Sequence, residues 1–171
     1  RALDKALMAR LAGSQWIGEH LNVLITGPTG IGKSWIACAL AHHACRQGYT
    51  ARYLRLPRLL QALQIAGGDG SYPKFLKQLA RVDALVIDDW GVAPLDDVAQ
   101  RDLLEIFDDR FNLRSTVITS QLPVSHWHQY LGDATLAEAI LDRLVHNAYK
   151  IEMKGESMRK QTAERKKDLE D

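Results

Sequence analysis

Three stretches of this sequence combine residue types that can handle phosphate and a metal ion. The first is "GPTGIGKS", which follows the pattern G-x-x-x-x-G-K-[ST]. Glycines at these spacings let the backbone N–H groups point at phosphate oxygens, and the helix that begins there directs its positive end to the same place. The sequence therefore predicts a nucleotide-binding loop with the following members: Gly27, Pro28, Thr29, Gly30, Ile31, Gly32, Lys33, Ser34 and the next residue, Trp35.

Within this loop, two side chains have predicted chemical roles. We expect Lys33 to reach the β- and γ-phosphates of ATP and the hydroxyl of Ser34 to bind Mg²⁺. The alternative is a glycine-rich turn that contains a lysine by chance. The predicted strand before the loop and the predicted helix after it favour the nucleotide-binding interpretation.

The second stretch is "LVIDDWG", an apolar run that ends in Asp88 and Asp89. Two adjacent carboxylates at the end of a buried strand are costly unless a cation lies opposite them. Where a P-loop is present, such an acid holds the metal from the other side, so we assign Asp88 to Mg²⁺. Asp89 is then predicted to orient and polarise the attacking water. The alternative is a solvated strand end.

The third stretch, "STVITSQ", ends in Ser120 and Gln121. In one large branch of P-loop proteins, an extra strand lies between the P-loop strand and the acidic strand, and it places a polar side chain near the γ-phosphate. Gln121 is the first candidate for this position and Ser120 is the second. Alternatively, either residue only caps the turn before Pro123.

Alternating strands and helices must position these residues. Apolar or alternating runs predict strands over 21–26, 50–56, 84–89, 115–120 and 150–153. Helical spacing predicts helices over 3–13, 33–47, 57–66, 74–82, 98–114, 124–131 and 135–149. A flexible break is expected over 67–73, and the charged tail is expected to fray from Arg159. This order predicts an α/β fold, a three-layer sandwich with a central parallel sheet.

Composition excludes few functions. The 171 residues are 46% hydrophobic and 25% charged, as in a globular domain, and the net charge of +1 gives no argument for or against nucleic acid. No apolar run approaches the ~18 residues of a membrane span, so no membrane partner is expected. Because the chain begins at Arg1 and not at a methionine, we expect it to be a piece of a longer protein.

Other residues are predicted to be structural. Cys38 and Cys45 are expected to be buried and reduced, as in a cytoplasmic protein, because with His42 they offer only three metal ligands on one helix. The histidines of "SHWH", at 126 and 128, lack a third ligand, so packing of Trp127 is the better interpretation. For adenine, the residues at 16 and 17, in "QWIG", are candidates by position alone.

Taken with "ILDRLVHNA" and "GESMRK", the three stretches resemble the AAA+ ATPases of the IstB/DnaC group, and IstB-like proteins most of all. The resemblance runs from about Leu11 to Lys160. It implies a P-loop NTPase of AAA+ type with a helical lead-in over 1–20, a core over 21–155 and a charged tail over 156–171. That tail is a short C-terminal extension in place of a full lid domain. The family's N-terminal region, which contacts DNA and partner proteins, is expected to be missing.

The resemblance also implies roles for two arginines. Arg143 matches an arginine finger that acts on ATP bound by the neighbouring subunit, a task that suits a permanently charged, forked guanidinium. Its alternative is an ion pair with Asp142 or Glu138 on its own helix. Arg159 matches a sensor that contacts the γ-phosphate in its own subunit, and its alternative is a solvated tail residue. Asp89 stands where the wider family has glutamate, which predicts slow or partner-dependent hydrolysis.

A basic segment between the second and third predicted strands is the expected DNA-binding surface. In related initiators and loaders, this region faces the central channel of the assembly. Contacts with DNA phosphates require positive charge but no base reading, so little sequence specificity is expected. The alternative is a solvated helix face. The predicted residues are Arg52, Arg55, Arg58, Lys74, Lys77 and Arg81.

The function implied by the resemblance is that of a Mg²⁺-dependent ATPase that helps transposition. It would assemble head-to-tail on duplex DNA with ATP, recruit and stimulate a transposase, and disassemble on hydrolysis. Three alternatives stay open: a DnaC-type helicase loader acting on single-stranded DNA, a small-molecule P-loop kinase, and a nucleotide-gated scaffold that hardly hydrolyses ATP.

Overall fold

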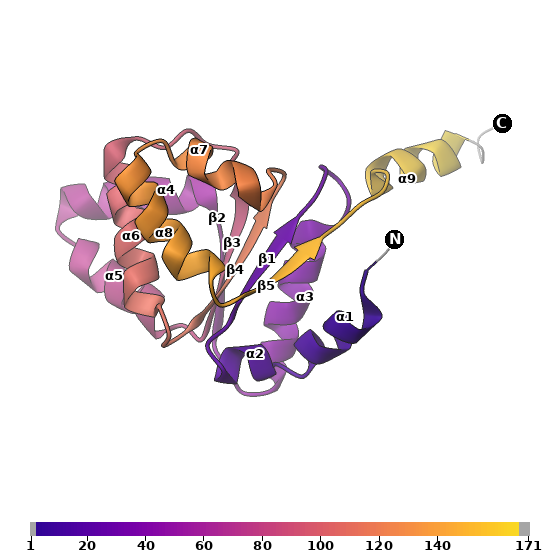
Figure 1. Ribbon diagram of the computed structural model, residues 1–171, viewed down its shortest axis with the longest axis horizontal. Coiled ribbons are helices and arrows are strands. Elements are labelled where there is room, and N and C mark those ends of the chain that lie inside the picture. The colour runs from indigo at the N-terminus through magenta and orange to yellow at the C-terminus, as the bar shows by residue number, and fades with distance from the viewer. Residues whose placement is uncertain (1–2, 168–171) are drawn as a thin grey trace.

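Five parallel strands form one sheet at the centre of the computed structural model, which describes residues 3–167 (Figure 1). Their order across the sheet is β2-β3-β4-β1-β5. The strand β4 thus lies between the strand that precedes the glycine-rich loop and the strand that carries the acidic pair, as predicted. The strands are β1 (Asn22–Thr26), β2 (Ala51–Arg55), β3 (Ala84–Trp90), β4 (Ser115–Ser120) and β5 (Ala148–Glu152).

Helices cover both faces of the sheet, which confirms the three-layer prediction (Figure 1). One face carries α1 (Lys5–Ala12), α2 (Gln15–Gly18) and α3 (Lys33–Arg46). The other face carries α4 (Leu56–Asp69), α5 (Tyr72–Arg81), α6 (Asp97–Arg110), α7 (Trp127–Leu131) and α8 (Ala134–Val145). Beyond β5, α9 (Met158–Lys167) projects from the body of the molecule. None of the helices within residues 3–167 is long and apolar enough to cross a membrane.

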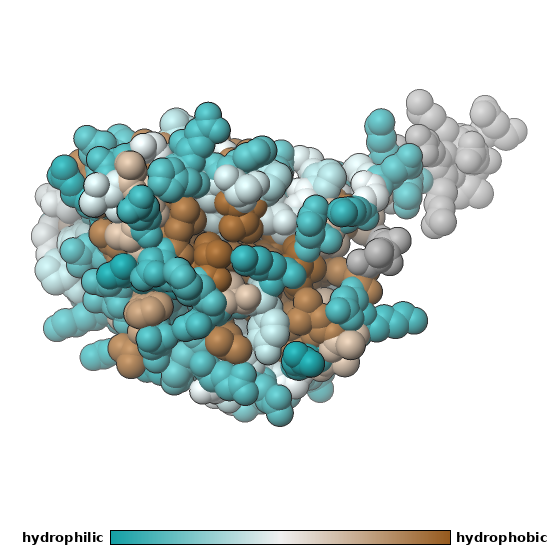
Figure 2. Space-filling model, in the orientation of Figure 1, coloured by the Kyte–Doolittle hydropathy of each residue, from teal (hydrophilic) through white to brown (hydrophobic). Residues whose placement is uncertain are grey.

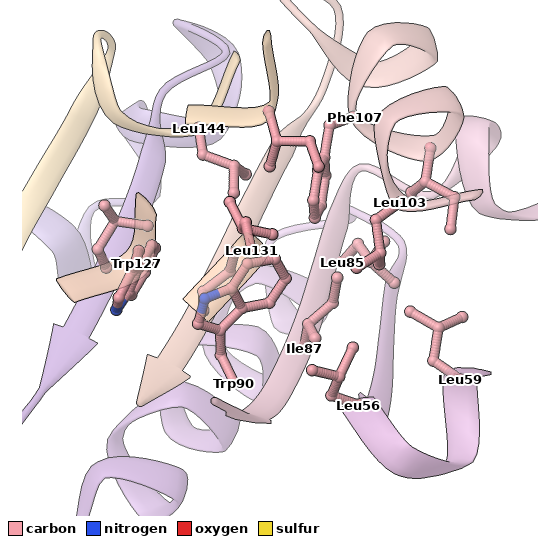
Figure 3. Packing of buried hydrophobic residues seen from close by; sticks show 14 of the residues in the cluster. Leu56, Leu59, Leu85, Ile87, Trp90, Leu103, Phe107, Trp127, Leu131 and Leu144 are labelled. Atoms are coloured by element: carbon pink, nitrogen blue, oxygen red, sulfur yellow. The ribbon is translucent and has the colours of Figure 1, made fainter. Parts of the chain in front are cut away.

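Strand alternation divides the apolar side chains between two clusters. Val86 faces α3, whereas its neighbours Leu85 and Ile87 face the α4–α8 layer. On that second side, Trp90 packs against Trp127 with ring centroids 5.5 Å apart (Figure 3). Trp127 is therefore a core residue, as predicted.

A β-bulge at the end of β3 decides where the acidic pair lies. The register pairs Ile87 with Ile118 and Trp90 with Ser120, so that the two aspartates both lie opposite one residue of β4. Without the extra residue, Trp90 would point toward α3 with Val86. The bulge therefore lets the strand end place a carboxylate on the α3 side and a tryptophan in the opposite core.

Not all of the surface is polar. Figure 2 shows apolar surface near the middle of the face that is seen in Figure 1, surrounded by hydrophilic residues. A groove of about 580 Å³ is lined on this side by α7, α8, β5 and Val124 in the 3-10 turn before α7, with Leu141 and Val145 among its apolar residues. Apolar side chains of α8 are thus in partial contact with solvent.

Several sequence predictions were wrong. The expected break over 67–73 is reduced to Gly70 and Ser71, because α4 continues to Asp69 and ends at Gly70, which takes the left-handed conformation (φ 81°). The helix expected over 135–149 ends at Val145, where β5 soon follows. The tail does not fray at Arg159 but continues as α9, and its residues 168–171 lie outside the described part of the chain.

The cysteines were also misjudged. Cys38 and Cys45 are free thiols on the exposed side of α3, so neither is the buried residue that was expected. Among residues 3–167, no cluster of three or more His, Cys, Asp or Glu side chains could hold a metal ion.

Arg110, at the end of α6, joins several elements at the amino edge of the sheet. It is 2% exposed and donates hydrogen bonds to the carbonyl oxygens of Leu79, Val82 and Ser115 at 2.5–2.6 Å. Burial and the nearby charge of Arg114 lower its pKa to about 9, so the guanidinium is still charged at pH 7. A buried cation here ties α5 and α6 to the starts of β3 and β4.

Replacing this guanidinium should destabilise the fold. Arg110→Met leaves buried carbonyl oxygens without donors, and we expect the free energy of unfolding to fall by about 3 kcal/mol or more. Urea unfolding measures the change. Arg114→Met is the control: its ion pair with Asp83 is 3.5 Å long and partly exposed, so its loss should cost less than about 1 kcal/mol. Equal losses in the two variants would contradict the role of Arg110.

Candidate functional site

The glycine-rich loop connects β1 to α3 at the carboxyl edge of the sheet. Gly30 and Gly32 have φ angles of 78° and 103°, which side chains rarely tolerate. A Cβ atom at Gly27 would lie 2.5 Å from the carbonyl oxygen of Met153, so glycine is needed there for close approach. The chain after β5 also holds the loop, since the backbone N–H of Met158 donates to the Gly30 carbonyl at 2.9 Å.

Lys33 points into this loop. Its ammonium group donates to the carbonyl oxygens of Gly27 and Pro28, both at 2.7 Å. Burial lowers the pKa of Lys33, and the charges of Asp88 and Asp89 oppose that shift. The side chain is thus held inside the loop, where N–H groups and the helix N-terminus attract anions.

Asp88 is the centre of a hydrogen-bonded cluster and is only 3% exposed. Its Oδ1 accepts from Ser34 at 2.9 Å and from the Thr119 hydroxyl, and its Oδ2 accepts from Tyr53 at 2.5 Å. Burial by itself raises the pKa of this carboxyl group, but hydrogen bonds from Thr119, Tyr53 and Ser34 outweigh burial and leave the pKa below its usual value. Asp88 is therefore ionised at neutral pH.

Ser34 and Asp88 form a donor set that fits Mg²⁺. Both offer oxygen atoms, which this ion prefers, and they lie together at the helix N-terminus where phosphates would bind. Since Mg²⁺ in nucleotide sites takes most of its ligands from phosphate and water, two protein oxygens suffice. When bound, the ion would neutralise phosphate charge.

Asp89 is held differently. It has a φ of 63°, a left-handed conformation that is unusual for an aspartate, and its backbone N–H donates to the Thr119 hydroxyl at 3.1 Å. Its Oδ2 pairs with the guanidinium of Arg55 at 2.8 Å. Such strain at a bulge is typical of functional positions. This pair was not predicted, because Arg55 was assigned to the DNA-binding surface.

The two candidates at the end of β4 differ in their contacts. The Ser120 hydroxyl is buried, donates to the Trp90 carbonyl at 2.6 Å and accepts from the N–H of Leu122 at 3.0 Å. Gln121 is exposed and lines a cavity of about 370 Å³ beside Gly27. Ser120 is thus engaged in local hydrogen bonds, and the placement of Gln121 near a bound phosphate stays a prediction.

Arg143 lies at the opposite edge of the sheet. Its backbone carbonyl accepts a hydrogen bond from the side chain of Asn22, the first residue of β1, whereas the loop follows the last residue of that strand. Its guanidinium pairs with Asp108 at 2.8 Å and, less closely, with Asp142 at 3.6 Å. Arg143 is thus separated by the length of β1 from the loop of its own subunit.

Arg159 lies in the first turn of α9 and is exposed. Nearby, the side chain of Ser157 packs so closely against Gly30 that no Cβ atom fits there. The start of α9 therefore lies beside the loop. Whether Arg159 contacts a nucleotide stays a prediction.

The predicted DNA-binding residues divide into separate places. Lys74, Lys77 and Arg81 are exposed on one stripe of α5, and Arg52 joins them because its guanidinium lies 5.3 Å from the ring centre of Phe75. Arg58, on α4, donates to Gln61 at 3.2 Å. Arg55 instead pairs with Asp89. A basic stripe thus exists on α5, and its DNA role stays a prediction.

The residues at 16 and 17, suggested for adenine, lie far from the loop, whereas Trp35 lies beside it. Trp16 and Ile17 are buried in the core at the amino edge of the sheet, where the Trp16 carbonyl accepts from Ser115, so the suggestion that they hold adenine was wrong. Trp35 is 75% exposed beside the loop.

Tyr53 and Thr119, which donate to Asp88, were not among the site residues predicted from the sequence. Strand alternation puts both on the α3 side, but only the strand order shows that β2 and β4 flank the acids.

Comparison with known proteins agrees with this geometry. The family model described as "IstB-like ATP binding protein" matches residues 1–166. A putative insertion sequence ATP-binding protein of Sinorhizobium fredii, y4pL, is 54% identical over 160 residues, 94% of this chain and 65% of the relative. The IS1162 putative ATP-binding protein of Pseudomonas fluorescens is 60% identical over 125 residues, 73% of this chain and 54% of the relative.

Among solved structures, the DnaC helicase loader is similar, with a TM-score of 0.74, 21% identity and 87% coverage of each chain. This likeness concerns the fold alone. The chain spans between half and two thirds of the length of the two insertion sequence relatives. With the fold, the loop and the family match in agreement, the chain belongs to the IstB-like ATP-binding family.

Proposed function

We propose that this chain is the ATPase core of a transposition helper. It binds ATP and Mg²⁺ at the loop, assembles head-to-tail on duplex DNA, recruits and stimulates a transposase, and disassembles when ATP is hydrolysed. The observation that carries the proposal is the convergence of Lys33, Ser34 and Asp88 at the carboxyl edge of β1 and β3. The names of the insertion sequence relatives support the biological setting.

Each side chain has a part in this proposal. Lys33 would turn from the loop carbonyls to the β- and γ-phosphates, and Gln121 would contact the γ-phosphate. Asp89 would have to leave Arg55 before it could orient a water molecule, which fits slow or partner-dependent hydrolysis. Arg159 would contact the γ-phosphate in its own subunit.

Arg143 supports a site shared between subunits. Its place at the amino edge of the sheet prevents it from reaching the nucleotide of its own subunit. Stacked head-to-tail, one subunit would present this edge to the loop of the next. The partner would thus complete the site, and ATP would favour assembly.

A helicase loader is the second candidate, favoured by the fold similarity to DnaC.

The two functions differ in the DNA that each prefers. Light scattering with a non-hydrolysable ATP analogue should give large particles with duplex DNA, and few particles with single strands of equal length. Lys33→Ala, the control, should stay small because its loop lacks the phosphate-binding cation. A preference for single strands would support the loader, and small particles under every condition would contradict assembly.

Mixing two inactive variants tests the shared site. Arg143→Ala removes the finger and Lys33→Ala disables the loop, so each alone should lose at least about tenfold in ATPase rate. Their mixture should recover activity, since the Arg143→Ala subunit keeps an intact loop that the Lys33→Ala subunit can complete. Steady-state phosphate release measures the rates.

The control for Arg143 is Asp108→Ala, which breaks the same ion pair and keeps the arginine. This variant should retain most of its activity. Equal loss in Asp108→Ala and Arg143→Ala, or a mixture as inactive as its components, would contradict a role in trans.

Charge reversal on α5 tests the basic stripe. Lys74→Glu combined with Lys77→Glu should weaken duplex binding about tenfold or more and reduce the salt dependence of log K by about two units. Filter binding over a salt series measures both. The control, Lys150→Glu with Lys154→Glu, changes the same charge beside the opposite edge strand and should have little effect. Full affinity in the α5 variant would contradict a role of the basic stripe in DNA binding.

A further inference from the structure

We propose that Tyr53 is a positioning residue for Mg²⁺, because its phenol group fixes the carboxylate of Asp88 in the orientation that receives the ion. The inference rests on the proposed ATP and Mg²⁺ site and assigns it a residue that no sequence motif contains. Tyr53 lies on β2, an edge strand of the sheet, and donates to Oδ2 of Asp88 at 2.5 Å.

Contacts on the two carboxylate oxygens are divided in a way that fixes the plane of the group. Oδ2 accepts from Tyr53 on one neighbouring strand, and Oδ1 accepts from Thr119 on the other. The two strands thus hold the carboxylate from both sides. Ser34, the third donor, comes from the helix that begins at the loop, and with Asp88 it would hold the metal.

Ser34 differs from the other two donors in what the metal requires of it. A serine that ligates Mg²⁺ gives its oxygen to the ion, so Asp88 is then no longer the sole partner of its hydroxyl group. Tyr53 and Thr119 have no such second role, so they can keep the carboxylate in place while Ser34 changes partner. Two of the three hydrogen bonds to Asp88 are thus kept when the metal binds, and only the contact with Ser34 changes.

Packing alone does not explain Tyr53. The residue is 43% exposed on an edge strand, so its ring contributes little to the core, yet its hydroxyl group is turned inward to a carboxylate that is 3% exposed. Without the hydroxyl group, Oδ2 loses its donor and the carboxylate can rotate, because torsions of this kind are broad. Loss of an outer partner of a metal ligand typically costs 10–100-fold in metal affinity.

The test is Tyr53→Phe, which keeps the ring and removes only the hydroxyl group. Binding of a fluorescent ATP analogue is titrated with Mg²⁺, and the half-saturating Mg²⁺ concentration is expected to rise about tenfold. Nucleotide affinity in EDTA should stay close to that of the parent chain, since the loop is unchanged. The melting temperature should fall no further than in Tyr72→Phe, which loses a similar tyrosine–aspartate hydrogen bond.

Tyr72→Phe is the matched control. Tyr72 also donates to an aspartate, Asp102, at 2.7 Å, but this pair joins α5 to α6 away from the loop. An unchanged Mg²⁺ requirement in Tyr53→Phe, or an equal rise in Tyr72→Phe, would overturn the proposal. A parent chain that binds no nucleotide with or without Mg²⁺ would instead overturn the proposed function, so the two failures can be told apart.

Discussion

The buried carboxylate of Asp88 is the constraint on which the site depends. A charge that is almost fully removed from water must be compensated by donors or by a cation. Here the donors come from β2, β4 and α3, which meet only if β3 is flanked by those two strands and α3 returns across the same face. The ionised state of Asp88 therefore depends on the strand order and on the side of the sheet that α3 covers.

The bulge at the end of β3 resolves a conflict between site and core. Strict alternation would put Asp88 and Trp90 on the same side of the sheet. The extra residue, Asp89, turns Trp90 into the opposite core, where it packs against Phe107 and Trp127 (Figure 3). Tyr130 also contacts the Trp90 ring. The cost is the left-handed backbone of Asp89, and the ion pair with Arg55 and the bond to Thr119 hold that conformation.

Much of this arrangement could be predicted from the sequence. The loop, the acidic strand and the alternation of strands and helices are local patterns, so the fold class and the identity of Lys33, Ser34 and Asp88 as candidates required no structure. The partners of Asp88 and Asp89 could not be predicted, because they depend on which strands are neighbours and in what register. The cation Arg110 was missed for the same reason: its acceptors come from α5, from the residue that follows this helix and from β4. The break after α4 was overpredicted, since two glycines inside a helix were given more weight than its apolar face.

A parallel sheet gives the subunit two different ends, and this difference affects how subunits can assemble. All five strands end at one edge, so the loop, the acids and Gln121 gather there, while Arg110 and Arg143 lie at the other. In the proposed end-to-end stacking, Arg143 of one subunit meets the loop of the next, and such head-to-tail contacts repeat as a ring or as an open helix, according to the rotation between neighbours. The strand direction that builds the binding site thus also places Arg143 at the end of the subunit that the proposed stacking would bring to a neighbour's loop.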